Sequence, residues 1–137
     1  ILRCLVGSEM CIRDRYINNM PTCLAAADLV IARAGAITLS EIQAQGKPSI
    51  LIPSPNVAEN HQYHNAMALA NKNAAVVIEE SELTPERLTR EIDKLASDSE
   101  RLAEFTKNAK AMAITDATKR IYSVIIEVLS ATKAKKK

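Results

Sequence analysis

Two short segments of the sequence carry the residues whose types and spacing could bind a ligand. The first is Arg33-Ala-Gly-Ala36, which follows an unbroken apolar run and opens an amphipathic stretch. Gly35 would let a ligand come close to the backbone, and the helix after it would offer unpaired N–H groups and a partial positive charge to a phosphate. Arg33 could add a charged clamp. The segment therefore predicts a phosphate-binding loop.

Glu41 stands six residues after Gly35 in the same amphipathic stretch. A carboxylate there can accept hydrogen bonds from two hydroxyl groups at once, as the 2′,3′-diol of a ribose would offer. A negative charge is also favourable near the N-terminus of a helix. The alternative for Glu41 is an ordinary solvated helix residue, and the spacing leaves both interpretations open.

The second segment is the loop 53–57 with the amide-rich stretch after it. Gln62 and Asn65 are three residues apart and share one helical face, and His61 lies four residues before Asn65. Amides suit sugar hydroxyls, because both groups donate and accept hydrogen bonds. Ordinary surface residues are the alternative. His61 and His64 lack a third metal ligand of suitable geometry, and neither a nucleophile beside a base nor a standard glycine-rich phosphate loop is present. We therefore expect no cofactor and no metal.

Alternating strands and helices would place both segments at one edge of a sheet. Apolar runs at 29–33, 49–53 and 74–78 are typical of buried strands, and helical stretches lie between them. Gly46 is the expected left-handed cap of the first helix, with Pro48 behind it. This alternation predicts an α/β fold with a parallel sheet and right-handed crossovers. Ligands bind such sheets at the carboxyl ends of the strands, where both segments fall.

The last third of the sequence is predicted to be helical. Thr84-Pro85 supplies an N-cap and a first-turn proline, Ser97 to Glu100 has the pattern of a capping box, and a final helix follows Thr115-Asp116. Apolar residues recur at helical spacing in all three helices, and we expect these stripes to face the core. They are Leu88, Ile92 and Leu95; Leu102, Phe105, Ala109 and Met112; and Ile121, Ile125, Val128 and Leu129.

The composition is that of one globular domain and argues against two classes of function. The 137 residues are 47% hydrophobic and 25% charged. With three Tyr, one Phe and no Trp, aromatic platforms for nucleic-acid bases would be hard to assemble. The net charge is only +2, and part of it lies in the Lys-rich tail at 131–137, so no nucleic-acid surface is expected. No apolar run of about 18 residues is present, which excludes a membrane span.

Residues 1–15 are interpreted as foreign to the domain. The run LVGSEMCIRDR at 5–15 resembles the translation of a transposase sequencing adapter, so it is set aside and the domain is taken as 16–130. Of the three cysteines only Cys23 then remains, which fits a reducing cytoplasm. Three strands are about half of a doubly wound domain. We therefore expect the natural protein to continue upstream, and we expect an uncovered strand edge and sheet face.

Several blocks of the sequence occur in the order found in one enzyme family. The blocks are Tyr16-Ile-Asn-Asn-Met20, Ala27-Asp-Leu-Val-Ile-Ala-Arg-Ala-Gly-Ala36, Thr38-Leu-Ser-Glu41, Gly46-Lys-Pro48, Ile52-Pro-Ser-Pro-Asn-Val-Ala-Glu-Asn-His-Gln62, Asn65-Ala66 and Asp116-Ala-Thr118. In them the chain closely resembles the MurG family of peptidoglycan glycosyltransferases, which convert lipid I to lipid II. The resemblance runs from Tyr16 to about Leu129.

The resemblance implies the C-terminal, Rossmann-like half of a two-domain B-type glycosyltransferase, in which this half binds UDP-GlcNAc. By position, the backbone of Ile17 would hold the uracil, with Tyr16 and Met20 packed nearby. The start of the helix would meet the diphosphate and the sugar through Gly35, Ala36, Ile37 and Thr38.

The family's polar contacts can be carried over in the same way. Glu41 matches the carboxylate that binds ribose, Gln62 the glutamine that binds GlcNAc hydroxyls, and Asn65 a sugar-side asparagine. His61 stands where other members carry a second glutamine. Ala34 departs from members that have serine, which removes a hydroxyl but leaves the backbone.

The resemblance also implies what lies upstream of Tyr16: glycine-rich loops and the acceptor domain with its proposed base. We therefore assign no catalytic residue, and the fragment alone is expected to be inactive. The whole enzyme would transfer GlcNAc to lipid I by direct displacement with inversion, with helix dipoles and side chains stabilising the departing UDP. It would be a peripheral protein at the cytoplasmic face of the bacterial plasma membrane. The alternatives are a diacylglycerol glucosyltransferase, a UDP-GlcNAc 2-epimerase, or a non-catalytic nucleotide-sugar-binding module.

Overall fold

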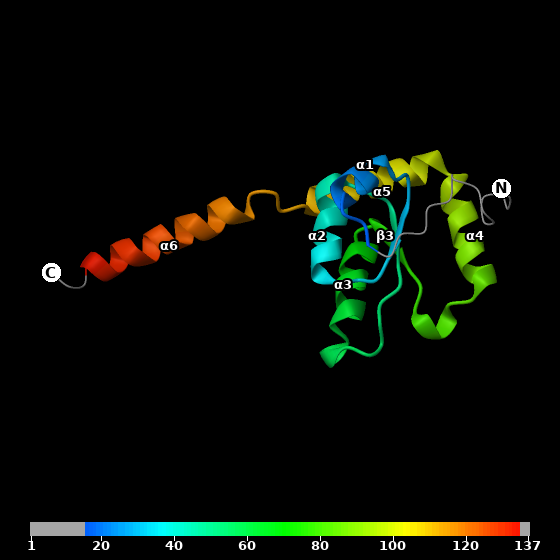
Figure 1. Ribbon diagram of the computed structural model, residues 1–137, viewed down its shortest axis with the longest axis horizontal. Coiled ribbons are helices and arrows are strands. Elements are labelled where there is room, and N and C mark those ends of the chain that lie inside the picture. The colour runs from blue at the N-terminus through cyan, green and yellow to red at the C-terminus, as the bar shows by residue number, and fades with distance from the viewer. Residues whose placement is uncertain (1–15, 135–137) are drawn as a thin grey trace.

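The computed structural model describes residues 16–134, and side chains as far as residue 131. The segment 1–15 that we interpreted as adapter-derived, and the last residues of the Lys-rich tail, lie outside the described residues. The described chain is a three-stranded parallel sheet with helices on both sides (Figure 1), which confirms the predicted partial Rossmann-like α/β fold.

The elements follow the predicted alternation, with somewhat shorter strands. In chain order they are α1 (Met20–Ala26), β1 (Val30–Ala32), α2 (Ala36–Gln45), β2 (Ser49–Leu51), the 3-10 turn η2 (Ala58–Asn60), α3 (His61–Ala70), β3 (Ala75–Val77), the 3-10 turn η3 (Glu80–Glu82), α4 (Pro85–Ala96), α5 (Ser99–Met112) and α6 (Ala117–Ala134). Each strand lies inside an apolar run of the sequence. The short helix α1 was not assigned from the sequence.

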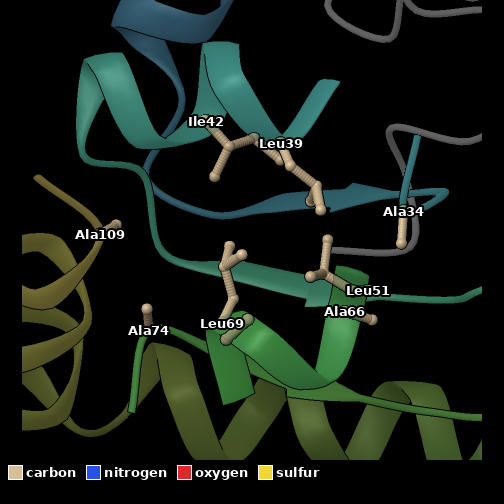
Figure 2. Close-up of a cluster of buried hydrophobic side chains, with 9 residues drawn as sticks. Ala34, Leu39, Ile42, Leu51, Ala66, Leu69, Ala74 and Ala109 are labelled. Carbon is tan, nitrogen blue, oxygen red and sulfur yellow. The ribbon is translucent and has the colours of Figure 1, made fainter. Parts of the chain in front are cut away.

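The strands lie in the order β1-β2-β3, and their side chains form two apolar cores, one on each face of the sheet. The first core joins the sheet to α2, α3 and the end of α5. In it Leu39 and Ile42 point from α2 toward Leu51 of β2 and Leu69 of α3 (Figure 2). The second core packs Ile50 and its neighbours against α4 and α5. Burial of these side chains on both faces is the main term that stabilises the fold.

The prediction of an uncovered sheet face is wrong for most of the sheet. Ile50 is fully buried, and Val76 beside it is half-buried against the second core. Only Ile31, their partner in register on β1, is largely open, with 43% of its surface exposed. The reason is that α4 and α5 fold back under β2 and β3 but leave β1 less covered. Within the described sheet β1 pairs on one side only, so the predicted open strand edge is present.

The predicted helix caps are mostly confirmed. Thr84 caps α4 by accepting a hydrogen bond of 3.1 Å from the backbone N–H of Arg87. For α5 the prediction was one residue out, because the cap is Asp98, whose carboxylate accepts from the N–H of Arg101 at 2.9 Å. Ser97 instead ends α4 and donates its hydroxyl to the carbonyl of Asp93. Serine and aspartate can both cap a helix N-terminus. Because α4 extends to Ala96, Ser97 is part of its C-terminal end, and Asp98 caps α5 instead.

Gly46 ends α2 in the left-handed conformation, with φ of 62°. Its N–H bonds to the carbonyl of Gln43 at 3.0 Å, and the next N–H, of Lys47, reaches back to Ile42 at 2.9 Å. This pair of bonds is a Schellman arrangement, and it confirms the predicted left-handed cap at Gly46. A Cβ at this position would also overlap the side chain of Lys110 from α5.

We expect Gly46→Ala to destabilise the fold. A left-handed residue with a Cβ costs roughly 1–2 kcal/mol, and the overlap with Lys110 adds to that cost. Urea unfolding of the wild type and the variant measures the difference. Gly46→Asn should fall between them, because asparagine tolerates this conformation better. Equal stability of Gly46→Ala and the wild type would contradict the structure at this turn.

The prediction that the apolar stripe of α6 faces the core is wrong. The helix projects away from the sheet and the other helices (Figure 1), and Ile121, Ile125, Val128 and Leu129 are 50–61% exposed. A helical stripe shows that one face is apolar, but it does not show what covers that face. Among residues 16–134, none of the helices combines the length and the apolar character needed to cross a lipid bilayer.

Candidate functional site

A pocket of about 360 Å³ lies between the segment before α1, helix α1, strand β1 and helix α2. It brings together four of the predicted binding residues, Ile17, Met20, Thr38 and Glu41. Its full lining is Ile17, Met20, Cys23, Leu24, Ala27, Leu29, Val30, Ile31, Ala32, Thr38 and Glu41. Most of these side chains are apolar, while Glu41 supplies a carboxylate and Thr38 a hydroxyl. Such a site can bind an aromatic ring against its apolar side chains and hydroxyl groups beside the carboxylate.

Helix α1 was not predicted from the sequence, although the spacing of its apolar residues indicates a helix. Met20, Cys23, Leu24 and Ala27 recur at the i, i+3, i+4 and i+7 spacing of one helical face, and all four line the pocket. Of the pocket residues in and just before α1, only Ile17 and Met20 were predicted to bind a ligand, and that prediction came from the family resemblance. The α1 face therefore supplies much of the apolar wall.

The start of α2 is open to a ligand. Gly35 occupies its N-cap position, and no side chain caps the helix there. The first N–H groups of an α-helix have no partner inside the helix, so those of Ala36, Ile37 and Thr38 are available to an anion. Ala36 is exposed, and 79% of the Ile37 surface is exposed.

Gly35 is required here neither by backbone geometry nor by packing. Its φ of −71° and ψ of 144° are accessible to any residue. A Cβ added to it would meet only Thr38 Oγ1, at the ordinary contact distance of 3.8 Å. The missing side chain leaves free space next to Thr38, which is itself a pocket residue. That space is what a ligand approaching the helix N-terminus would use.

Glu41 lies in the second turn of α2, and it is exposed. The field of a helix terminus falls off within the first turn, so the helix start favours this carboxylate less than its position in the sequence predicts. The pocket wall instead sets the carboxylate beside Thr38 and the apolar residues of α1.

Gln62 and Asn65 lie half-buried on α3, and each is tied to a loop at the carboxyl end of a strand. Oε1 of Gln62 accepts a 3.0 Å hydrogen bond from the N–H of Ser54, after β2. Nδ2 of Asn65 donates to the carbonyl of Ala34, after β1, over 3.4 Å. The structure therefore connects both predicted ligand-binding segments through α3. His61 is exposed, and its Nδ1 lies 2.8 Å from the carbonyl of Ala58.

The backbone just before Gln62 is strained. Glu59 and Asn60 both adopt left-handed conformations, with φ of 52° and 51°. Asparagine tolerates this region, but for glutamate it costs about 1–2 kcal/mol. Such strain is concentrated at functional sites, where the surrounding structure holds it.

Arg33 is not among the residues that line the pocket. Its Nη1 forms a 2.6 Å ion pair with Glu80 of η3 and also donates to the carbonyl of Ile52 at 3.3 Å. The hydrogen bond between the two side chains raises the pKa of Arg33 and lowers the pKa of Glu80. Both groups are exposed, so the pair is screened by solvent. In this structure Arg33 ties β1 to η3, and its predicted role as a phosphate clamp would require that pair to open.

The other features of the surface offer weaker sites. A more open hollow, of about 660 Å³, is lined by Pro85, Glu86, Thr89, Arg90, Asp93, Lys94 and Ser97. All of these belong to α4 or the residue that ends it, so the hollow is one side of a single helix and contains none of the predicted residues. Within residues 16–134 no group of three or more His, Cys, Asp or Glu side chains is placed to hold a metal ion.

Comparisons with known proteins identify the family of the chain. The family model described as the glycosyltransferase family 28 C-terminal domain matches residues 8–121. Several curated relatives bear the name UDP-N-acetylglucosamine--N-acetylmuramyl-(pentapeptide) pyrophosphoryl-undecaprenol N-acetylglucosamine transferase. The one from Acetivibrio thermocellus is 54% identical over 114 residues, covering 83% of this chain and 31% of the relative. The one from Halalkalibacterium halodurans is 48% identical over 120 residues, covering 88% and 33%.

A solved structure gives the same result for the fold. The crystal structure of Acinetobacter baumannii MurG superposes with a TM-score of 0.76 at 32% sequence identity, covering 82% of this chain and 32% of that one. The chain therefore spans about a third of the length of the relatives it matches.

Proposed function

The chain belongs to the family of glycosyltransferase family 28 C-terminal domains, and from this premise we propose that it is the donor-binding part of a longer hexosyltransferase. The proposed reaction moves GlcNAc from UDP-GlcNAc to lipid I, which makes lipid II in peptidoglycan synthesis. The names of the curated relatives support the reaction. The observation that carries the role of this chain is the pocket, in which Ile17, Met20, Thr38 and Glu41 meet beside the uncapped start of α2.

The geometry suggests how the donor would lie. The uracil would rest on the apolar wall of Ile17 and Met20, and the ribose diol would donate to the carboxylate of Glu41. The diphosphate would then reach the N–H groups at the start of α2, past the free space at Gly35. This order puts the GlcNAc on the side of Gln62 and Asn65, because Asn65 bonds to the loop that carries Gly35.

This chain would assist the reaction by stabilising the leaving group. As the acceptor hydroxyl displaces UDP from the anomeric carbon, negative charge grows on the diphosphate. Preorganised N–H donors and the helix field at the start of α2 stabilise that charge most where it is greatest, in the transition state. The base and the lipid acceptor site would belong to the rest of the longer protein, which would act as a peripheral protein at the cytoplasmic face of the plasma membrane.

The test is a transfer assay with the full-length protein that contains this chain. Radiolabelled UDP-GlcNAc and a lipid I analogue should give labelled lipid II analogue, while UDP-glucose and UDP-GalNAc in place of the donor should give far less. Transfer with UDP-glucose at an equal rate would point to another glycosyltransferase. UDP-GlcNAc converted to a free 2-epimer without transfer would point to an epimerase. Either result would reject the proposed function.

A further inference from the structure

Helix α1 supplies much of the apolar wall of the pocket, but little within the helix itself holds it in place. It has seven residues, and an isolated helix of that length is not stable in water. One of its side chains, Leu24, is buried. Among the described residues no side chain caps its N-terminus, and its last turn contains no basic residue. Contacts from other parts of the chain must therefore keep α1 beside the pocket.

One such contact comes from the turn after α2. Nζ of Lys47 donates to the carbonyl of Ala25 at 2.8 Å and to the carbonyl of Ala27 at 2.9 Å. Both carbonyls lie at the C-terminal end of α1, where backbone carbonyls lack helical partners and a positive charge is favourable. The backbone of Lys47 is itself fixed, because its N–H bonds to the carbonyl of Ile42 at 2.9 Å. Lys47 thus supplies the basic group that the last turn of α1 lacks.

A second side chain from the same segment holds the start of α1. Nε2 of Gln45 donates to the carbonyl of Pro21 over 3.1 Å. Gln45 and Lys47 are both half-buried, and neither lines the pocket. A nucleotide in the pocket would therefore not contact them. Any effect of these two residues on its binding must act through α1.

We propose that Lys47 is a positioning residue for the nucleotide. By holding the C-terminal end of α1, it keeps Met20 and Leu24 in place as part of the apolar wall. This inference rests on the proposed function, and it adds a residue outside the pocket that sets the affinity for the donor. The wall is complete only when α1 is docked, so the apparent affinity falls with the docked fraction. The chemical step stays unchanged, because the leaving group is stabilised at the start of α2.

Hydrogen exchange in the full-length protein tests whether Lys47 holds α1. Lys47→Met removes the ammonium group and keeps an apolar stem of similar length. The amide of Ala27, which bonds to the carbonyl of Cys23 at 3.1 Å, should exchange about 5- to 20-fold faster in this variant. The amide of Ile78, which bonds to Leu51 of β2, should keep its rate. Saturating UDP should slow the Ala27 amide again, because nucleotide binding and helix docking are linked.

Steady-state kinetics and calorimetric titration then test the effect on the donor. Lys47→Met should raise KM for UDP-GlcNAc and Kd for UDP by about 3- to 10-fold, with kcat within about 2-fold of the wild type. Lys47→Arg keeps the charge and the N–H donors, so it should recover most of the affinity. Lys110→Met is the matched control. It removes another lysine that lines the same hollow of about 300 Å³ but has no bond to α1, and it should bind UDP normally.

Normal affinity for UDP in a Lys47→Met protein would overturn the inference, and so would an unchanged exchange rate at Ala27. Equal acceleration at Ala27 and Ile78, or a loss of kcat that matches the rise in KM, would overturn it as well, because Lys47 would then support the whole fold. Failure of the proposed function differs from these results, because the wild type itself would then bind neither UDP nor UDP-GlcNAc.

Discussion

Replacing Glu41 with alanine should reduce kcat/KM for UDP-GlcNAc by roughly 30- to 1000-fold in the full-length protein. The carboxylate lines the pocket beside Thr38 and can accept hydrogen bonds from both hydroxyls of the ribose. Hydrogen bonds to a charged group are worth about 1.5–3 kcal/mol each and are rarely additive, so the loss should be about 2–4 kcal/mol. At about 1.4 kcal/mol per tenfold change, this gives the stated range. Steady-state kinetics with varied donor concentration measures it.

Two further variants control this experiment. Gln at position 41 keeps one accepting oxygen, so Glu41→Gln should lie between the wild type and Glu41→Ala. Glu104→Ala removes an exposed glutamate from α5, outside the pocket, and should change neither activity nor stability by more than about 0.5 kcal/mol. Thermal unfolding of each variant separates a binding defect from a folding defect. Near-normal kcat/KM in a stable Glu41→Ala protein would show that Glu41 is only a solvated helix residue.

Gly35→Val should reduce kcat/KM by roughly 30- to 300-fold and leave the fold intact. The backbone at this position suits valine, and an added Cβ meets only Thr38 Oγ1 at 3.8 Å, but valine is a poorer N-cap than glycine, so the free energy of unfolding should fall by no more than about 1.5 kcal/mol. The branched side chain would fill the space through which a diphosphate reaches the first N–H groups of α2. Losing such contacts costs about 2–3.5 kcal/mol, which is the stated range.

Gly35→Ala is the matched, smaller step and should show an intermediate loss. The contrast with Gly46 is informative, because there the conformation and the side chain of Lys110 make glycine a structural requirement. We therefore expect the Gly35 variants to lose far more activity than stability, whereas Gly46→Ala should mainly lose stability. A Gly35→Val protein with unchanged kcat/KM would remove the start of α2 from the site.

Features set by a few neighbouring residues could be predicted from the sequence. The apolar runs specified the three strands, Gly46 the end of α2, and Thr84 with Pro85 the start of α4. Each of these depends on local backbone chemistry, which a short window of sequence contains. The choice between Ser97 and Asp98 as the cap of α5 needed the structure, because both residue types can serve and only the end of α4 decides.

Contacts between distant segments could not be predicted from the residues alone. The pocket needs α1 packed beside β1 and α2, and the ion pair joins Arg33 to a residue 47 positions later. Arg33 lies close to Gly35 in the sequence, and that position predicted a phosphate clamp. Its partner in the structure is Glu80, because η3 folds next to the end of β1. The proposed binding roles of Ile17 and Met20 rest on the family resemblance. The stripe on α6 was assigned to the core because periodicity reveals an apolar face but no partner for it.

The most direct test of this account is a crystal structure of the full-length protein with UDP-GlcNAc. We predict the ribose hydroxyl oxygens at about 2.5–3.0 Å from the carboxylate of Glu41, the uracil against Ile17 and Met20, and the diphosphate at the N–H groups that begin α2. A nucleotide bound elsewhere, such as along α4, with Glu41 still facing solvent, would contradict the assignment of this pocket as the donor site.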